Sequence, residues 1–273
     1  MKYAICILAH KDPVLLARIV NKLTADNVKI YIHLDKKSDI NAFTKCVNAK
    51  FIKERENVYW GGRSIVKAMY NLLYNVIMDN ECDYILFISG QDYPLVLPEK
   101  YDCVIDKNNN YIEYYDFPRA DWYNGGLDRI RYYYLFENNK SFIYKASVKI
   151  QKLLKVNRKV KHDFTLYCGS QWINININTA KEILNSFKYY YKYFKLTHIP
   201  DEMIYQTIIM NSKHKEYVVN DNLRYIRFIN NLPNPKVLDD TDFNDIITSK
   251  ALFIRKVENN SLLDKVDQHQ RNN

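Results

Sequence analysis

Glycine and proline are scarce in this sequence of 273 residues, which contains six glycines and seven prolines. No G-x-G-x-x-G follows the first apolar segment, and no G-x-x-x-x-G-K-[ST] occurs anywhere. Their absence argues against dinucleotide oxidoreductases and P-loop enzymes, so a bound phosphate must be held by side chains. Because no Pro-rich or Gly-rich linker divides the chain, we expect one domain over residues 1–273.

Cysteine pairing and long hydrophobic runs are also missing. The cysteines are odd in number, scattered and without C-x-x-C spacing: Cys6, Cys46, Cys82, Cys103 and Cys168. Neither a disulfide framework nor a zinc site is indicated, and a reducing compartment fits best. The apolar run in "MKYAICILAHKDP" is too short for a signal peptide or a membrane span. We therefore expect a cytoplasmic protein.

The positive charge of the chain is concentrated in one region. The net charge is +9, and between Arg119 and Lys161 eleven Lys or Arg stand against three Asp or Glu. Within it, "SFIYKASVKIQKLLKVNRKVK" predicts an amphipathic helix with Lys145, Lys149 and Lys152 beside an apolar stripe. Such a helix either packs on the core with a solvated basic face, the more common case, or lies on an anionic membrane surface.

Strand and helix patterns alternate along the first half of the chain. Helical segments separate three apolar strands, which are "YAICILA" (Tyr3–Ala9), "KIYIHLD" (Lys29–Asp35) and "YILFIS" (Tyr84–Ser89). This rhythm predicts a parallel, Rossmann-like half over residues 1–117. Strands and helices in residues 118–258 form the second half, and we expect the tail, residues 259–273, to be frayed.

The third strand runs into the polar turn "SGQDYP", which begins at Ser89. The carboxyl ends of strands are where ligands bind in proteins of this class, so the turn is a candidate site. The second half is rich in Tyr and Trp, whose faces suit the C–H faces of sugars, while Asn, Gln, Asp and Glu suit the hydroxyl groups. These features together indicate a nucleotide-sugar glycosyltransferase.

Nine motifs follow one another from Tyr3 to about Lys256: "CILAHKDP", "IYIHLDKKSD", "VYWGGRSIVKAMYNLL", "YILFISGQDYPL", "NYIE", "CGSQWINININ", "IPDEMIYQT", "LRYI" and "LFIRK". This ordered set resembles the core-2/I-branching N-acetylglucosaminyltransferase family, which also contains the peptide xylosyltransferases. The resemblance implies an α/β fold of the GT-A type, with a Rossmann-like nucleotide half and a mixed acceptor half. It also implies inverting transfer that needs no divalent metal or other cofactor.

The resemblance assigns the catalytic step to one carboxylate. Glu202, in the "PDE" motif, matches the family's catalytic base, and inversion by a single displacement needs one such base. From the residues alone, an N-terminal helix cap is the favoured interpretation of both Asp201 and Glu202. The spacing of Asp240-Thr241-Asp242 is that of an Asp-x-Asp metal motif, but we expect these residues to cap a late helix.

The resemblance also supplies residues for the donor. Arg224 and Lys256 match the two basic residues that hold the diphosphate in place of a metal. Arg227 and Arg255 are close to these residues in sequence. Strand alternation predicts that they point to the faces opposite to Arg224 and Lys256, so they are weaker candidates. Two carboxylates complete the set of donor residues. Asp35 matches the residue at the uridine end, although a simple role in a turn also explains it. Asp92 lies in the turn after the third strand.

Acceptor residues are assigned more loosely. Glu113, in "NYIE", matches an acceptor-binding glutamate, and Arg129 and Arg131 lie near acceptor-contacting basic residues. Trp172 lies where the acceptor wall of the family begins. It is either a platform for a sugar ring or part of the core, and both interpretations stay open.

The sequence thus predicts transfer of N-acetylglucosamine from UDP-GlcNAc to a hydroxyl of a glycan or lipid-linked glycan in β linkage. UDP-xylose is an alternative donor within the class. The composition suggests a bacterial member that assembles surface polysaccharide in the cytoplasm, in peripheral contact with the anionic inner membrane face. A non-catalytic module that binds glycan or nucleic acid is the alternative outside the class. A binding module has no need to keep Glu202, Arg224 and Lys256 together in matching motifs. We therefore expect no nucleic-acid partner.

Overall fold

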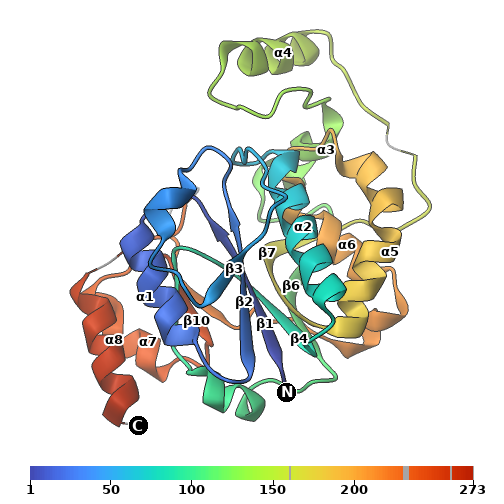
Figure 1. Ribbon diagram of the computed structural model, residues 1–273. Helices are drawn as coiled ribbons and strands as arrows, with labels where there is room; N and C mark the ends of the chain where they lie inside the picture. Colours follow the sequence, from blue (N-terminus) through green and yellow to red (C-terminus); the bar gives the residue numbers. More distant parts are fainter. Residues whose placement is uncertain (160, 230–233, 259, 273) are drawn as a thin grey trace.

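A seven-stranded sheet forms the centre of the molecule, with strand order β3-β2-β1-β4-β7-β6-β8 (Figure 1). A smaller sheet of order β5-β10-β9 stands beside it. The structure is a computed structural model and describes residues 1–159, 161–229, 234–258 and 260–272.

The strands are β1 (Tyr3–Ala9), β2 (Val28–Leu34), β3 (Ala49–Phe51), β4 (Tyr84–Ser89), β5 (Asp92–Pro94), β6 (Asn110–Asp116), β7 (Tyr167–Asn176), β8 (Val218–Val219), β9 (Arg224–Ile226) and β10 (Phe253–Arg255). The α-helices are α1 (Pro13–Leu23), α2 (Arg63–Asp79), α3 (Asp128–Arg131), α4 (Phe142–Leu153), α5 (Ile177–Phe194), α6 (Ile204–Met210), α7 (Phe243–Thr248) and α8 (Ser261–Asn272).

The first half has the predicted parallel arrangement. Strand β1 pairs in parallel with β2 and β4, and β2 pairs in parallel with β3. Every residue of β1 except Leu8 is buried, as expected for a strand covered on both faces. Its side chains divide between two cores, since Tyr3, Ile5 and Ile7 belong to one cluster and Ala4 and Cys6 to the other.

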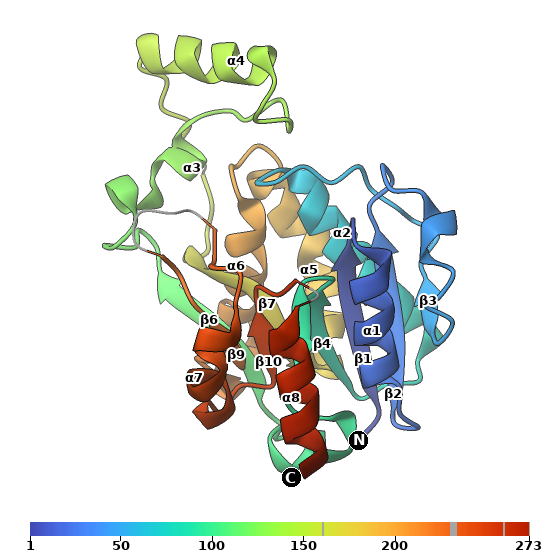
Figure 2. The same ribbon diagram turned by 90° about the vertical axis from the view of Figure 1, so that its left-hand side faces the viewer.

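The second half continues the same sheet with mixed strand directions. Strand β7 runs antiparallel to β4 and to β6, and β8 is parallel to β6. Helices α2, α5 and α6 cover one face of the sheet, while α1, α7, α8 and the small sheet lie on the other (Figures 1 and 2). The predicted fold class, a Rossmann-like half joined to a mixed half, is confirmed.

The small sheet brings the last strand back to the first half. Strand β10 lies between β5, to which it is antiparallel, and β9, to which it is parallel. Residues 253–255 therefore lie beside the turn that follows β4, although they are far from it in sequence. This return places late basic residues next to the carboxyl ends of early strands.

The "PDE" segment differs from the expected helix. Residues Pro200–Glu202 form a single 3₁₀ turn, and α6 begins only at Ile204. In α6, residues 204–209 are all buried, so the helix is enclosed rather than amphipathic. The capping expected of Asp240-Thr241-Asp242 is confirmed, because Asp239 and Asp242 form a capping box there.

The prediction that the tail is frayed is wrong. Residues Ser261–Asn272 form α8, in which Leu262, Leu263 and Val266 are fully buried. The Asp267 carboxylate accepts a hydrogen bond from Tyr93 Oη at 2.8 Å and pairs with Arg18 at 2.8 Å. Apolar contacts and these polar contacts together hold the helix against α1 and β5.

Helix α4 confirms the predicted amphipathic pattern but not the predicted packing. It projects from the body near α3, and none of its residues is buried (Figures 1 and 2). The more common interpretation, a helix packed on the core through its apolar stripe, is therefore wrong. Across the residues that the structure describes, we find no helix with the length and hydrophobicity that a membrane span requires.

Docking of α8 predicts a measurable contribution to stability. Leu263→Ala removes a fully buried side chain, and we expect it to lower the free energy of unfolding by about 2–5 kcal/mol in urea titrations. Gln268→Ala on the exposed side of the same helix is the control and should change it little. Equal effects of the two substitutions would contradict the docked helix.

Candidate active site

A cavity of about 450 Å³ opens at the carboxyl ends of β1, β2 and β4. Its wall includes residues from the segments that follow these strands, together with residues from β7 and β10. The lining side chains include His10, Lys11, Asp35, Lys37, Trp60, Gln91, Trp172, Arg255 and Lys256. The site predicted from the end of the third strand is thus part of a larger cavity.

Positive charge dominates this cavity, which we call the donor cavity because Asp35 and Lys256, two of the predicted donor residues, line it. Lys11, Lys37, Arg255 and Lys256 line it, whereas Asp35 is the acidic residue in its wall. Burial lowers the pKa of Lys256, and the neighbouring charges of Lys11 and Arg255 lower it further. Cations held this close repel one another, so a bound anion relieves the repulsion. The cavity is therefore suited to a phosphate-bearing ligand.

Asp35 and Gln91 are buried polar residues in the wall of the donor cavity. Asp35 is buried, and its carboxylate accepts a hydrogen bond from the backbone N–H of Lys37 at 2.9 Å while pairing with Lys37 Nζ at 3.2 Å. Gln91 is also buried, and its Nε2 has no hydrogen-bond partner within the described residues. A buried donor without a partner is unusual in a folded protein, and this one belongs to a residue of the cavity wall.

Asp92 lies beneath the cavity rather than in its wall. The side chain is fully buried and accepts hydrogen bonds from Ser89 N at 2.6 Å and from Arg255 Nη1 at 3.1 Å. Arg224 Nε lies 3.7 Å from its other oxygen. The sequence predicts a direct contact between Asp92 and the donor. Because the side chain is buried, Asp92 can act on a ligand only through Arg255, whose guanidinium it holds.

Arg255, and not Arg224 as predicted, lines the donor cavity. The side chain of Arg224 is fully buried, donates to the carbonyls of Phe87 and Asn222, and does not line the donor cavity. Burial lowers its pKa to about 10. Arg255, which we had expected to point away, does line the cavity, with 18% of its side chain exposed.

The strand register explains this difference. Arg224 stands opposite Phe253, and Arg255 lies two residues further along β10, so both arginines point to the same face of the small sheet. Alternation along one strand correctly separates Arg227 from Arg224, and Arg227 instead pairs with the buried Asp242 at 2.7 Å. It fails between Arg255 and Lys256, which both line the donor cavity, because β10 ends at Arg255 and alternation does not extend to Lys256.

Trp172 lies with the donor cavity and not with the acceptor residues. It is 5% exposed, belongs to the core, and is one of the residues that line the cavity. The guanidinium carbon of Arg255 lies 4.6 Å from the centre of its ring, and that of Arg224 lies 5.4 Å away. Trp172 is thus a flat support for two cations.

Glu202 pairs with one of the predicted acceptor residues. Arg129 Nη1 donates to Glu202 Oε2 at 2.7 Å, which leaves Oε1 outside this ion pair. The preceding Asp201 is buried, and its Oδ1 has no hydrogen-bond partner in the described part of the chain. Burial and the charge of Glu202 raise the pKa of Asp201 to about 7. Two adjacent carboxylates therefore have different environments.

Glu113 lies close to the same place, at an irregular point of β6. The pairing of β6 with β7 shifts between Ile112 and Tyr114, and a Cβ at Gly169 would lie 1.9 Å from the carbonyl oxygen of Glu113. Only glycine permits this approach. Burial raises the pKa of Glu113, and its Oε2 accepts a hydrogen bond from Asn222 Nδ2 at 2.7 Å. Glu113 lines a second cavity of about 360 Å³, shared with Arg224.

Sequence reasoning missed Trp122. Its half-buried ring lies 3.6 Å from the guanidinium carbon of Arg129 and 5.4 Å from that of Arg119. The signal available was the pattern "RADW" in a basic, aromatic segment, but spacing alone does not bring Arg129 back onto this ring. Arg131, the other predicted acceptor residue, lies on α3, where its guanidinium is 3.8 Å from the Asp128 carboxylate.

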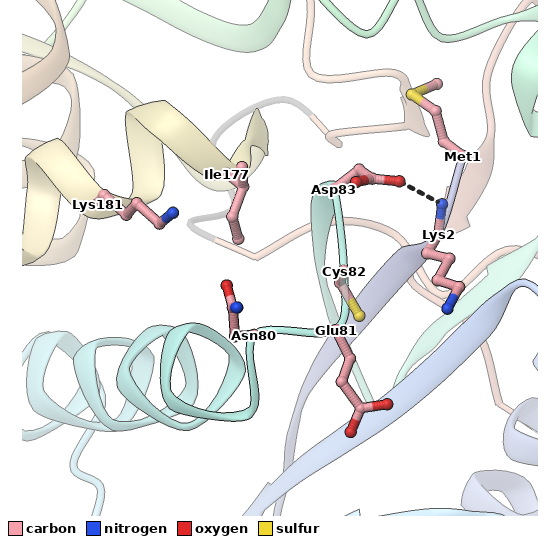
Figure 3. A pocket seen from close by; sticks show the side chains of 8 residues that line it. All are labelled: Met1, Lys2, Asn80, Glu81, Cys82, Asp83, Ile177 and Lys181. Atoms are coloured by element: carbon pink, nitrogen blue, oxygen red, sulfur yellow. Dashed lines mark hydrogen bonds between the residues drawn. The ribbon is translucent and has the colours of Figure 1, made fainter.

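Another hollow lies at the opposite edge of the sheet (Figure 3). It measures about 720 Å³ and is formed around the amino ends of β1 and β4, where Lys2 N donates to the Asp83 carboxylate at 2.9 Å. Acidic and basic residues are mixed in its wall, among them Glu81 and Lys181. It lacks the convergence of cations that marks the donor cavity.

Comparison with known proteins identifies the family. The model of the Core-2/I-Branching enzyme family matches residues 5–248. The match covers most of the chain, and the chain belongs to this family, as its ordered motifs predicted. Membership agrees with the glycosyltransferase class and with the GT-A-type architecture expected from the sequence and matched by the mixed sheet.

Curated relatives include enzymes named for the transfer of different sugars. A xylosyltransferase of Ciona intestinalis is 23% identical over 71% of this chain, and xylosyltransferase 1 of Homo sapiens is 21% identical over 71%. A β-1,3-galactosyl-O-glycosyl-glycoprotein β-1,6-N-acetylglucosaminyltransferase 4 of Mus musculus is 23% identical over 76%. The aligned regions span 23%, 20% and 46% of these relatives, respectively.

Solved structures that are similar to this chain also carry glycosyltransferase titles. Mouse xyloside xylosyltransferase 1 in its apo form has a TM-score of 0.42 at 13% identity, covering 93% of this chain and 97% of that one. The galactosyltransferase LgtC has a TM-score of 0.41 at 11% identity, covering 79% and 72%.

The raised pKa of Asp201 predicts a pH-dependent stability. The folded protein holds this proton more tightly than the unfolded chain, so the contribution of Asp201 to stability falls as the pH rises from about 4 to about 7. Asp201→Asn removes that dependence. We expect urea titrations to show the variant gaining stability relative to the wild type between pH 4.5 and 7.5.

The exposed Asp26→Asn is the matched control, and its difference from the wild type should not follow the same trend. A difference for Asp201→Asn that is the same at both pH values would show that Asp201 is ionised throughout.

Proposed function

We propose that this protein is an inverting glycosyltransferase that moves N-acetylglucosamine from UDP-GlcNAc to a hydroxyl of a glycan acceptor in β linkage. The observation that carries the proposal is a cation-lined cavity at the strand ends of a chain that belongs to this family. The Glu202 carboxylate, held by Arg129, supplies the second element that the reaction needs.

The donor binds with its diphosphate against Arg255 and Lys256. Two cations can stabilise the charge that develops on departing UDP, in the place that a divalent metal takes in other enzymes, so the proposed reaction is metal-independent. Asp92 orients Arg255 from below, and Trp172 supports it. Asp35 accepts a hydrogen bond from the uridine end, and Trp60, 55% exposed at the cavity, offers a ring on which the base can stack.

Glu202 acts as the base in a single displacement. The acceptor hydroxyl gives its proton to Oε1, its oxygen forms the new bond to the anomeric carbon, and the bond from that carbon to UDP breaks. Arg129 holds Oε2 and so fixes the orientation of the carboxylate. The electron pair of the broken bond leaves with UDP, whose added charge is met by Arg255 and Lys256.

The acceptor lies against the residues around Glu202. Glu113 can accept hydrogen bonds from sugar hydroxyls, and the ring of Trp122 can support the apolar face of a sugar. Arg129 contacts both Trp122 and Glu202, which supports its place between the acceptor and the base. Arg131, partly buried on α3, is a more distant contact for the acceptor.

UDP-xylose is the second candidate donor. The names of several relatives, including those from Ciona intestinalis and Homo sapiens, favour it. The two donors differ in the size of the sugar, and the residues that bind uridine and diphosphate are suited to both.

We place the reaction in a reducing cytoplasm, in the assembly of a bacterial surface polysaccharide. The five cysteines are free thiols, and Cys6, Cys46, Cys82 and Cys168 are buried. Free thiols that have not paired support a reducing compartment. A lipid-linked glycan is the acceptor that such a pathway uses.

Loss of the base gives the first test. Glu202→Gln keeps the shape of the side chain but cannot accept the proton, and we expect it to lower transfer at least 100-fold. The measurement is UDP release from a panel of UDP-sugars in the presence of EDTA, with and without glycan acceptors. Glu216→Gln, at an exposed position in a 3₁₀ turn, is the control.

One donor should be cleaved by the wild type in EDTA and spared by the Glu202 variant. Cleavage that disappears with EDTA would contradict the role of the two cations. If no donor were cleaved and UDP did not stabilise the protein, the non-catalytic binding module would be the better description.

Diphosphate binding gives the second test. Arg255→Met and Lys256→Met each remove a cation from the donor cavity, and each should weaken UDP binding by about 10-fold to 100-fold, as expected for a charge-assisted hydrogen bond. Arg227→Met is the matched control, because that arginine points to the other face and pairs with Asp242. UDP-induced shifts in Tm report the affinity, and equal shifts in all three variants would refute the assignment.

A further inference from the structure

Helix α4 carries an uncovered apolar side. The side chains of Phe142, Ile150 and Leu153 are 86%, 54% and 72% exposed. At 100° per residue these positions fall on one side of the helix. The apolar side continues into a groove of about 480 Å³ that is lined by Leu135, Ile143 and other residues. Exposed apolar area of this kind marks an interaction surface.

The other side of the helix contacts the segment that precedes α4 and, through one side chain, His198. Gln151 accepts a hydrogen bond from Tyr133 N at 2.7 Å and donates one to Tyr133 O at 2.9 Å. Tyr144 Oη lies 3.3 Å from His198 Nδ1. These contacts fix how α4 is rotated, so the apolar side is held outward rather than left free to turn inward.

Lysines border the apolar side along its whole length. Lys145, Lys149 and Lys152 are exposed and fall on the flank next to Phe142 and Leu153. Across residues 119–161 basic side chains outnumber acidic ones by eleven to three. An apolar strip beside a row of lysines matches the acyl chains and the anionic headgroups of a lipid surface.

The helix lies at the same end of the molecule as the candidate site. In both views α4 is at the top, whereas the amino terminus, where β1 begins, is at the bottom (Figures 1 and 2). The carboxyl ends of the parallel strands, which open into the donor cavity, therefore point toward the α4 end. A surface bound by α4 therefore lies at the end of the protein that carries the donor cavity.

We propose that α4 docks on an anionic lipid surface, with Phe142, Ile150 and Leu153 in the acyl boundary and the lysine row on the headgroups. This docking follows from the geometry and charge of α4 alone. Its consequence, that a lipid-linked acceptor is taken directly from the surface, rests on the proposed function.

Vesicle flotation tests the proposal. We expect the wild-type protein to float with vesicles of phosphatidylcholine and phosphatidylglycerol, not with phosphatidylcholine alone, and less at high salt. Lys145/Lys149/Lys152→Glu should lower the partition coefficient by roughly 100-fold or more. Phe142/Ile150/Leu153→Ser should abolish flotation, and because these side chains are exposed the fold should be retained, as thermal melting checks.

A matched control separates this surface from the net charge of the chain. Lys181/Lys213/Lys215→Glu makes the same change of charge at exposed positions on α5 and the 3₁₀ turn after α6, and flotation should persist. Equal loss in the control would overturn the proposal, as would a wild-type protein that does not float. A dimer in sedimentation that the serine variant converts to monomer would also overturn it, by assigning the apolar side to a second copy.

Flotation needs no donor or acceptor, so its result is independent of glycosyl transfer. Donor cleavage without flotation would reject the docking and keep the proposed function. Flotation without donor cleavage would keep the docking and reject the function.

Discussion

The buried carboxylate of Asp92 is the interaction on which the candidate site depends. It is fully buried yet faces two arginines, with Arg255 at 3.1 Å and Arg224 at 3.7 Å. An isolated buried charge is costly, and removing one partner of such a group typically costs about 3–5 kcal/mol. The three side chains must therefore stay together. Their pairing fixes the place of Arg255, which is the member that reaches the donor cavity.

The small sheet makes this pairing possible. Strand β5 carries Asp92, β9 carries Arg224 and β10 carries Arg255, and β10 lies between the other two. Pairing of β5 with β10 brings residues more than 150 positions apart into contact. Lys256 follows directly, and so a second cation reaches the same cavity. The turn after β4, the late basic strand and the ends of the parallel strands become one site through this pairing.

Local patterns were enough to predict the parallel half and the helical character of α4. The apolar runs at Tyr3–Ala9 and Tyr84–Ser89 define buried strands whatever their partners are. The role of Arg255 was predicted wrongly from alternation with Lys256, because β10 ends at Arg255 and the two neighbours both line the donor cavity. The prediction for the tail was wrong because its sequence is mostly polar. Leu262, Leu263 and Val266 are buried only because α8 packs on α1 and β5, which a local pattern does not show. Trp122 was missed because its contact with Arg129 arises only when the chain turns back at α3.

In the proposed reaction, side chains alone hold the diphosphate of the donor. Calorimetric titration in EDTA of UDP, UMP and uridine tests this most directly. Affinity should rise steeply from uridine to UDP, because each added phosphate meets the cations contributed by Arg255 and Lys256. Uridine that binds as tightly as UDP, or UDP that binds only after a divalent metal is added, would contradict the account.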